Sequence, residues 1–225
     1  MSNMINLIPL SFLSKMGMYD IEIHGANVKV SVVDNHALVD AKINELKSSL
    51  QTSQRPVVGL DIKFALRNDI GDDEIFQAED YLPVGKILLL CVGTDCLMIQ
   101  LPATSMEVTD NFRQFLSDES ICFLGTEMRE KVEELGRHYF SKDTQHVDCK
   151  TGIEVGYLAA KILKKGNVDK YGLSELAGEV GMDIKEPIGA RPDWHAVAFS
   201  DEEVKYAVHN AYTSYVIGNK LLDML

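Results

Sequence analysis

The sequence predicts an α/β fold in which a mixed sheet, an antiparallel meander plus parallel strands, is flanked by helices. One pair of segments alternates apolar and polar residues on either side of a short turn, which is the pattern of a β-hairpin, and a second pair of segments flanks the turn Gly93-Thr94-Asp95. Between residues 108 and 139, two helical segments flank a short apolar strand, and this alternation is typical of parallel strands joined by helical crossovers. The remainder of the chain has mainly helical periodicity. We therefore expect strands first and helices last.

The expected elements follow from these patterns in chain order. Strands are predicted at 19–24, 27–33, 57–64, 86–92, 96–101 and 121–124, with the first hairpin turning at Gly25, Ala26 and Asn27. Helices are predicted at about 35–50, 108–116, 127–139, 153–163, 174–180 and 201–222. Asp34 or Asn35 is suited to cap the first of these helices, and Ser200 the last.

Length and composition indicate one folded domain. The chain has 225 residues, with 46% hydrophobic and 25% charged, which is ordinary for a globular protein and argues against disorder. Its 22 Lys and Arg residues face 34 Asp and Glu residues, and the resulting net charge of −12 repels a polyanion such as bulk duplex nucleic acid. A local positive site could still hold a phosphate, because salt confines surface charges to about 10 Å.

Of the two irregular regions, the first is interpreted as a flexible or packed extension and the second is predicted to lie at the surface. Residues 1–18 are interpreted as an N-terminal extension to a domain spanning 19–225, since the run 5–13 is short, contains Pro9 and lacks a preceding basic region. We expect no membrane association, and a cytoplasmic or nuclear location. Residues 67–85 form an acidic connection that ends in Pro83 and Gly85.

The cysteines suggest no metal cluster. The four cysteines form no CxxC pair and fall in apparent strands, so reduced, buried thiols are expected at Cys91, Cys96, Cys122 and Cys149.

Three segments carry a resemblance to a known family. They are Val57-Val58-Gly59-Leu60-Asp61-Ile62-Lys63-Phe64, the strand-to-helix segment 123–135, and Tyr206-Ala207-Val208-His209-Asn210-Ala211-Tyr212. In order and spacing they resemble the three motifs of the DEDDy 3′-5′ exonucleases, most closely the Werner-syndrome-type exonuclease domain and its small plant relatives. The resemblance covers about 19–222 and implies an RNase H-like fold with a nucleic-acid 3′ end as substrate.

The acidic residues of that family are largely replaced here. The resemblance implies four carboxylates that hold two Mg²⁺ or Mn²⁺ ions on either side of the scissile phosphate. Only Asp61 matches; Lys63, Lys131 and Asn210 stand at the other three positions, so the formal charge of the set changes from −4 to +1. Such a set repels divalent cations. We therefore expect two-metal hydrolysis to be lost and no cofactor, with Mg²⁺ or Mn²⁺ needed only if activity is retained.

Each candidate residue has a functional and a structural interpretation. Asp61 could hold a metal weakly, or pair as an ion with Lys63, which lies two residues along the strand and so on the same face. Lys63 and Lys131 could bind a phosphate in place of metals, or extend to solvent. Tyr206 could donate its hydroxyl to a phosphate, or serve as half-buried packing.

Four neighbouring features bear on this site. A shift of one residue in the second motif would place Glu130, rather than Lys131, at the acid position and allow one weak metal site. The acidic stretch 69–80 could lend a carboxylate, although such runs are usually solvated. His209 is expected at the surface, and Trp194 is expected to anchor the loop before the last helix.

Two functions remain open on the sequence. The first is an exonuclease-fold protein, impaired in catalysis, that binds single-stranded nucleic-acid 3′ ends or assembles with itself or with active relatives. The second is an active 3′-5′ exonuclease with a divergent site. The resemblance to ring-forming plant relatives makes a homo-oligomer or a mixed assembly an expectation.

Overall fold

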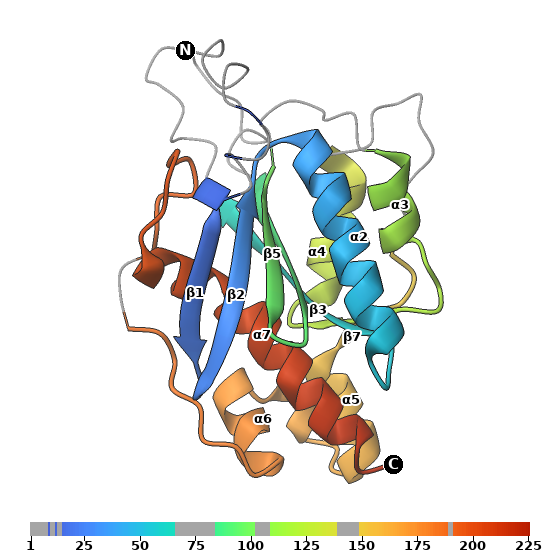
Figure 1. The fold of residues 1–225 in the computed structure, drawn as a ribbon. Helices are drawn as coiled ribbons and strands as arrows, with labels where there is room; N and C mark the ends of the chain where they lie inside the picture. Colours follow the sequence, from blue (N-terminus) through green and yellow to red (C-terminus); the bar gives the residue numbers. More distant parts are fainter. Residues whose placement is uncertain are drawn as a thin grey trace, which may run out of the picture.

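A seven-stranded sheet in the order β1-β2-β5-β4-β3-β6-β7 runs through the protein (Figure 1). The computed structural model describes residues 9, 12, 15–65, 84–101, 109–138, 149–188 and 191–225. The strands are β1 (Met18–Ile23), β2 (Ala26–Val33), β3 (Val57–Ala65), β4 (Val84–Val92), β5 (Asp95–Gln100), β6 (Cys122–Gly125) and β7 (Gly152–Glu154). The helices are α2 (His36–Thr52), α3 (Asp110–Leu116), α4 (Met128–His138), α5 (Val155–Leu163), the 3₁₀ helix η4 (Val168–Lys170), α6 (Leu173–Glu179) and α7 (Asp201–Leu222).

The sheet is mixed, as the sequence predicts. β1–β2, β3–β4 and β4–β5 are antiparallel pairs, whereas β2–β5, β3–β6 and β6–β7 are parallel. The α/β fold with an antiparallel meander plus parallel strands is therefore confirmed. The short strand β7 was predicted as part of a helix; it forms because β6 offers it an edge for parallel pairing, which only the tertiary structure provides.

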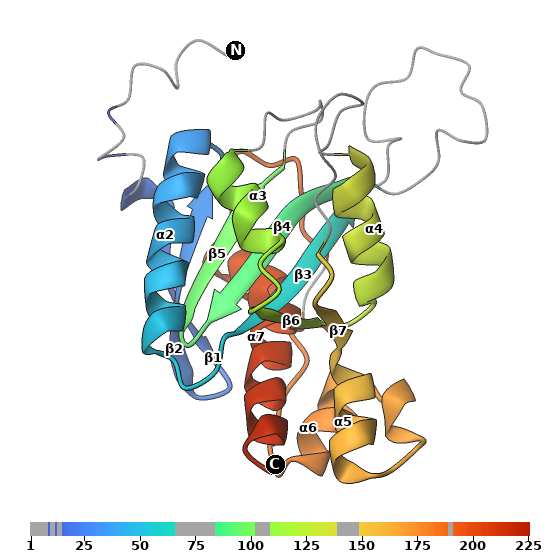
Figure 2. The ribbon, with the colours of Figure 1, turned by 90° about the vertical axis from the view of Figure 1, so that its right-hand side faces the viewer.

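Helices cover both faces of this sheet. On one face, α2, α3 and α4 bury a core that includes Ile43, Phe115, Phe123 and the side chains of Leu60 and Ile62 on β3 (Figure 2). On the other face, α7 packs against β1 and β4. Because side chains alternate along a strand, Asp61, which lies between Leu60 and Ile62 on β3, faces the α7 side.

α7 lies directly against β3 at one glycine. A Cβ atom at Gly59 would come within 2.0 Å of the carbonyl oxygen of Ala211 on α7, so the absence of a side chain permits this close approach. The N-terminus of α7 is fixed by a capping box, in which Ser200 and Glu203 satisfy each other's backbone N–H groups. The predicted Ser200 cap is thus confirmed.

The first hairpin turns one residue earlier than predicted. His24 and Gly25 form a two-residue turn with positive φ angles of 50° and 78°, and Ile23 pairs directly with Ala26. Such turns match the right-handed twist of the flanking strands, which explains why the shorter loop is adopted. Of the two candidate caps for the first long helix, Asn35 is the one observed, since its side chain accepts a hydrogen bond from the N–H of Ala37 at 2.9 Å.

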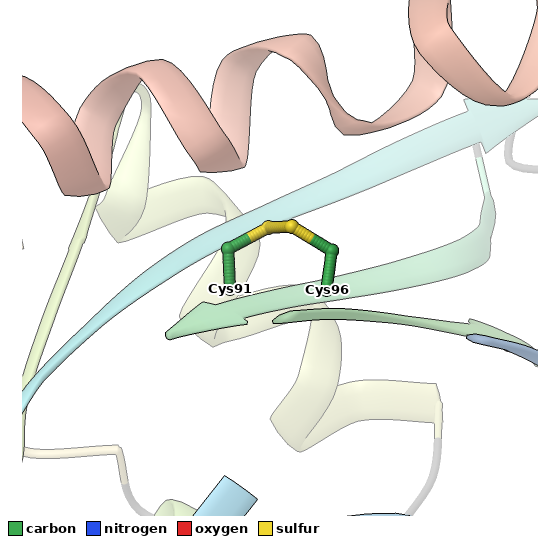
Figure 3. Close-up of a disulfide and its surroundings, with 2 residues drawn as sticks. All are labelled: Cys91 and Cys96. Atoms are coloured by element: carbon green, nitrogen blue, oxygen red, sulfur yellow. A yellow bond between two sulfur atoms is a disulfide. The ribbon is translucent and has the colours of Figure 1, made fainter. Parts of the chain in front are cut away.

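The expectation of four reduced cysteines is wrong for one pair. Cys91 on β4 and Cys96 on β5 are joined by a disulfide, with their Cα atoms 4.2 Å apart (Figure 3). The antiparallel register places the two residues directly opposite each other, which their separation in the sequence does not reveal. Cys122 and Cys149 remain thiols, and burial raises the pKa of the Cys122 thiol.

Two regions of the sequence analysis fall largely outside the described residues. These are most of the N-terminal extension, 1–18, and the acidic connection up to residue 83; residues 84 and 85 belong to β4. Within the described part of the chain, no helix combines the length and the apolar character that crossing a membrane requires.

The contact at Gly59 gives a first prediction. Gly59→Ala should lower the free energy of unfolding by about 1–3 kcal/mol or more, because the new methyl group meets a backbone carbonyl that cannot rotate away. Urea denaturation followed by circular dichroism measures this change. Gly178→Ala, in α6, is the control: a Cβ there meets nothing within 4 Å, so stability should be unchanged or rise. Equal effects of the two substitutions would contradict the assigned contact.

Candidate functional site

Asp61 lies buried at the centre of the region that the sequence motifs indicate. It is on β3, facing the α7 side, with only 1% of its surface exposed. β6 pairs with β3 only from Val57 to Gly59, so the edge of β3 beyond Gly59 has no β6 partner. The helix that follows β6, α4, reaches this edge instead and brings a lysine to Asp61.

Two lysines close on the Asp61 carboxylate. The Nζ atom of Lys131 lies 2.6 Å from Oδ1, and the Nζ atom of Lys63 lies 2.7 Å from Oδ2. The contact of Lys63 with Oδ2 of Asp61 is an ion pair, but its geometry is not that of a hydrogen bond. Lys131 also donates to the backbone carbonyl of Thr126 at 2.6 Å. We call Asp61, Lys63 and Lys131 the ion triad; the predicted pairing of Asp61 with Lys63 is confirmed.

The start of α4 is built to hold Lys131 in this position. The side chain of Glu154, at the end of β7, accepts a hydrogen bond from the N–H of Met128 and so fixes the first turn of the helix. Gly125, at the end of β6, sits so close to β3 that a Cβ there would lie 2.4 Å from the carbonyl oxygen of Leu60. Lys131, one turn into the helix, is thereby directed at the β3 edge.

α7 supplies the third side of the site. The Lys63 ammonium lies over the ring of Tyr206, 5.7 Å from the ring centre, which is within the range of a cation–π contact. Asn210 is turned elsewhere: its Oδ1 atom lies 3.2 Å from Nδ1 of His209. The structure therefore brings Asp61, Lys63, Lys131 and Tyr206 together, and the contact it shows for Asn210 is with His209.

Two alternative interpretations of the second motif are wrong. Glu130 is exposed, whereas Lys131 is the residue that touches Asp61, so the register shifted by one residue does not occur. Lys131 does not extend to solvent either, because only 3% of its side chain is exposed. Lys63 is also largely buried, with 12% of its side chain exposed. The carboxylate of Asp61 holds both ammonium groups inside the protein.

The structure also corrects one neighbouring prediction and confirms another. His209 is not a surface residue; it is 2% exposed, because the β1–β2 turn brings His24 against it with the ring centres 5.2 Å apart. No local pattern signals this contact, since it joins the two ends of the domain. Trp194 is buried against Phe199 and Tyr206, as expected for a residue that anchors the loop before α7.

The electrostatics of the triad favour a charged Asp61. Burial raises the pKa of this carboxyl group, but the adjacent ammonium groups of Lys63 and Lys131 outweigh burial and lower it below the ordinary value of 3.8. One carboxylate and two ammonium groups leave the triad with a formal charge of +1. The exposed Glu127 carboxylate adds a weaker contact, 3.8 Å from Lys131.

These residues do not fit a divalent metal pair. Both oxygens of the Asp61 carboxylate already face ammonium nitrogens at contact distance, and those nitrogens carry no lone pair that could bind a metal. Among the residues that the structure describes, no group of three His, Cys, Asp or Glu side chains could hold a metal ion. The arrangement holds the Lys63 ammonium group over the ring of Tyr206, and each oxygen of the Asp61 carboxylate contacts an ammonium group.

The architecture is shared with known exonucleases. Escherichia coli RNase D, an exoribonuclease involved in structured RNA processing, superposes with a TM-score of 0.60 and 16% identity over 87% of this chain. The fold is the RNase H-like exonuclease fold. Brucella melitensis NrnC with bound Mg²⁺ superposes with a TM-score of 0.53 and 19% identity, covering 78% of this chain and 76% of NrnC. This chain spans 44% of the RNase D chain. No protein-family model and no curated protein matches the sequence.

The triad predicts a large cost for neutralising its carboxylate. Asp61→Asn should lower the free energy of unfolding by about 3–5 kcal/mol, because it leaves two buried ammonium groups without a counter-ion. Urea denaturation at neutral pH measures the loss. The same substitution at Asp223, which pairs with Arg55 at the surface, is the control and should cost less than about 1 kcal/mol. Similar losses in both variants would show that Asp61 is not a buried counter-ion.

The lowered pKa of Asp61 predicts how this stabilisation depends on pH. A carboxyl group whose folded pKa lies below its unfolded value contributes stability that is complete above the unfolded pKa, 3.8, and is lost as pH falls through the folded pKa. The difference in unfolding free energy between the wild type and Asp61→Asn should therefore stay constant above pH 3.8 and shrink below it. Urea titrations from neutral pH into the acid range test this. A difference that shrinks already between neutral pH and 3.8 would contradict the assignment.

Proposed function

We propose that this chain is an exonuclease-fold protein that does not hydrolyse phosphodiesters by a two-metal mechanism and acts by binding. The observation that carries the proposal is the ion triad, in which Lys63 and Lys131 occupy both oxygens of the Asp61 carboxylate. Asp61 is the only acid left at the family's four metal-binding positions, and it has no oxygen free for a metal. Lys63, Lys131 and Asn210 are the replacements at the other three.

The charge at the site supports this proposal. NrnC, which has a similar fold, has a solved structure with bound Mg²⁺. Collecting such ions needs negative charge, because Mg²⁺ gives up its water ligands reluctantly. A triad of formal charge +1 repels a divalent ion instead. In this proposal the ammonium groups of Lys63 and Lys131 supply the positive charge that metal ions would otherwise bring to this site. The domain keeps its fold without bound metal ions.

Two kinds of binding partner follow from the same arrangement. A single-stranded nucleic-acid 3′ end is the substrate class of the resembled family, and a solved structure shows NrnC bound to pGG. For this chain, Lys63 is the most accessible charge of the triad, and Tyr206 lies beneath it as a hydroxyl donor or stacking surface. A second copy of this chain, or an active protein of the same fold, is the other partner.

The geometry and the net charge argue against a nucleic-acid partner. Lys63 and Lys131 are already neutralised in part by Asp61 and lie largely out of solvent, so a phosphate would have to displace an existing ion pair. The net charge of −12 adds long-range repulsion of a nucleic acid. We therefore propose homo-oligomerisation, or mixed assembly with active relatives, as the main role, and 3′-end binding by Lys63, Lys131 and Tyr206 as the second.

Reconstruction of the acidic set tests the loss of hydrolysis. The wild type should not trim the 3′ end of single-stranded RNA or DNA with Mg²⁺ or Mn²⁺, and millimolar metal should not raise its melting temperature. The triple variant Lys63→Glu, Lys131→Asp and Asn210→Asp should bind metal, and its melting temperature should rise with metal concentration, because an ion that binds only the folded state stabilises it. Gel-based trimming assays and thermal scans measure both.

The controls separate loss of hydrolysis from the choice of partner. Robust trimming by the wild type, abolished in Asp61→Ala, would refute the proposal. Fluorescence anisotropy with labelled oligonucleotides in EDTA, compared for the wild type and Lys63→Ala, tests 3′-end binding. Light scattering after size-exclusion chromatography tests self-assembly. A monomer that also binds oligonucleotide through Lys63 would replace the protein partner with the nucleic acid.

A further inference from the structure

The β1–β2 turn is held against α7 by a histidine. The ring of His24 packs edge-on against the ring of His209, with 5.2 Å between the ring centres, and is stacked on the ring of Tyr212 at 6.4 Å. Its Nε2 atom lies 2.9 Å from Oγ1 of Thr213, one helical turn after His209. Three residues of α7 therefore contact a single side chain of the turn.

The same contacts extend to the segment that connects α6 with α7. One carboxylate oxygen of Glu186, Oε2, lies 3.8 Å from Nδ1 of His209. The other, Oε1, accepts a hydrogen bond of 2.7 Å from the hydroxyl of Ser174 in the first turn of α6. The hairpin, α7 and the connecting segment thus meet at one place. We call the four residues that join them the histidine latch: His24, Glu186, His209 and Thr213.

A positive charge on His24 is poorly accommodated in the docked turn. The contacts of its ring described above are with a hydroxyl, a phenol and a second imidazole, and burial raises the pKa of the Tyr212 phenol, which keeps it uncharged. Burial lowers the pKa of His24 below its ordinary value of 6.5, and the adjacent His209 lowers it further. The docked turn therefore takes up a proton less readily than a turn released into water.

The charged groups around His24 do not reverse this effect. Glu186 raises the pKa of His24 and Lys205 lowers it, and both act less strongly than burial. His24 keeps part of its surface exposed and lines a pocket of about 500 Å³ beneath the turn, so water reaches its ring. All charged residues of this pocket except Lys205 are exposed, and water and salt screen them. They come from β1, the connecting segment and α7: Glu22, Asp183, Lys185, Glu186, Glu202 and Lys205.

We propose that the histidine latch is a pH-sensitive switch that releases the β1–β2 turn from α7 in mild acid. At neutral pH the uncharged ring of His24 stays packed on the helix. A base whose docked pKa lies below its value in the released state contributes stability that is complete above 6.5 and is lost as pH falls toward the docked pKa. Release uncovers Ile23 at the end of β1, which is buried in the core shared with α7. The switch does not depend on the role proposed for the ion triad.

Nuclear magnetic resonance of the labelled full chain, from about pH 8 to about pH 5, tests the proposal. The titration midpoint of the His24 ring should lie below 6.5. Cross-peaks between the rings of His24 and Tyr212 should be present at the upper end and lost at the lower end. Amide protection factors at Ile23 and Ala26, corrected for intrinsic exchange, should fall by up to about tenfold per pH unit below the ordinary histidine pKa, while Leu89 in β4 stays protected.

Two substitutions separate the latch from other effects of acid. His24 has a φ of 50°, and two-residue hairpin turns prefer Asn, Asp or Gly at such a position. His24→Asn therefore keeps the turn and removes the ring, and protection of the turn should no longer change with pH over this range. His195→Asn is the matched control, because it removes an exposed histidine of the loop before α7 and should leave the pH dependence intact.

Two further substitutions test whether His24 takes up its proton in the docked position. Glu186→Gln should lower the midpoint of His24, because it removes the carboxylate that favours the charged ring. Lys205→Gln should raise the midpoint, because it removes an ammonium group that repels the charged ring. The two midpoints, read from the same ring resonance, should therefore move in opposite directions.

Four outcomes would overturn the proposal. The first is a His24 midpoint at or above 6.5. The second is persistence of the contacts between His24 and Tyr212 after His24 has become charged. The third is a turn in His24→Asn that opens in acid as it does in the wild type. The fourth is parallel loss of protection at Leu89, which would show that acid unfolds the whole domain and not the turn.

Discussion

The carboxylate of Asp61 is the group on which the centre of this protein depends. It is buried, and it faces one ammonium group on each oxygen, at 2.7 Å and 2.6 Å. Neither lysine could stay inside the protein without it, because an unpaired buried ammonium group costs several kcal/mol. The same carboxylate joins three elements: β3, which carries Asp61 and Lys63; α4, which carries Lys131; and α7, whose Tyr206 lies under the Lys63 ammonium.

Under the proposed function, this interaction accounts for how a fold shared with exonucleases can persist without a pair of bound metal ions. A site with four acids and no bound metal would suffer repulsion among its carboxylates. Lys63 and Lys131 stand at two of those positions, and their ammonium groups attract the Asp61 carboxylate where further carboxylates would repel it. In that proposal the fold needs no bound ion at this place, since both oxygens of the Asp61 carboxylate contact an ammonium group.

α7 contributes to the surroundings of the ion triad and to a pocket beneath the β1–β2 turn. The helix lies on β3 because Gly59 lets the backbone at Ala211 approach closely. From that fixed position one part of the helix presents Tyr206 to the triad, and the following turn presents His209 to the pocket beneath the β1–β2 turn. Asn210, at the last motif position, is hydrogen-bonded to His209. Asn210 thus contacts a residue that lines this pocket.

The sequence by itself determined the mixed α/β fold, the order of its main elements and the composition of the candidate site. These features follow from local rules: alternation placed Asp61 and Lys63 on one face of β3, and the apolar stripe of α4 placed Lys131 beside its buried side. Tertiary structure alone decided the rest. The disulfide between Cys91 and Cys96 depends on hairpin register, and the burial of His209 depends on a turn almost two hundred residues away in the chain, at His24. The approach of α4 to the edge of β3 likewise decided that Lys131 faces Asp61 and not solvent. Helix periodicity predicts the direction of a side chain, but not which group that side chain contacts.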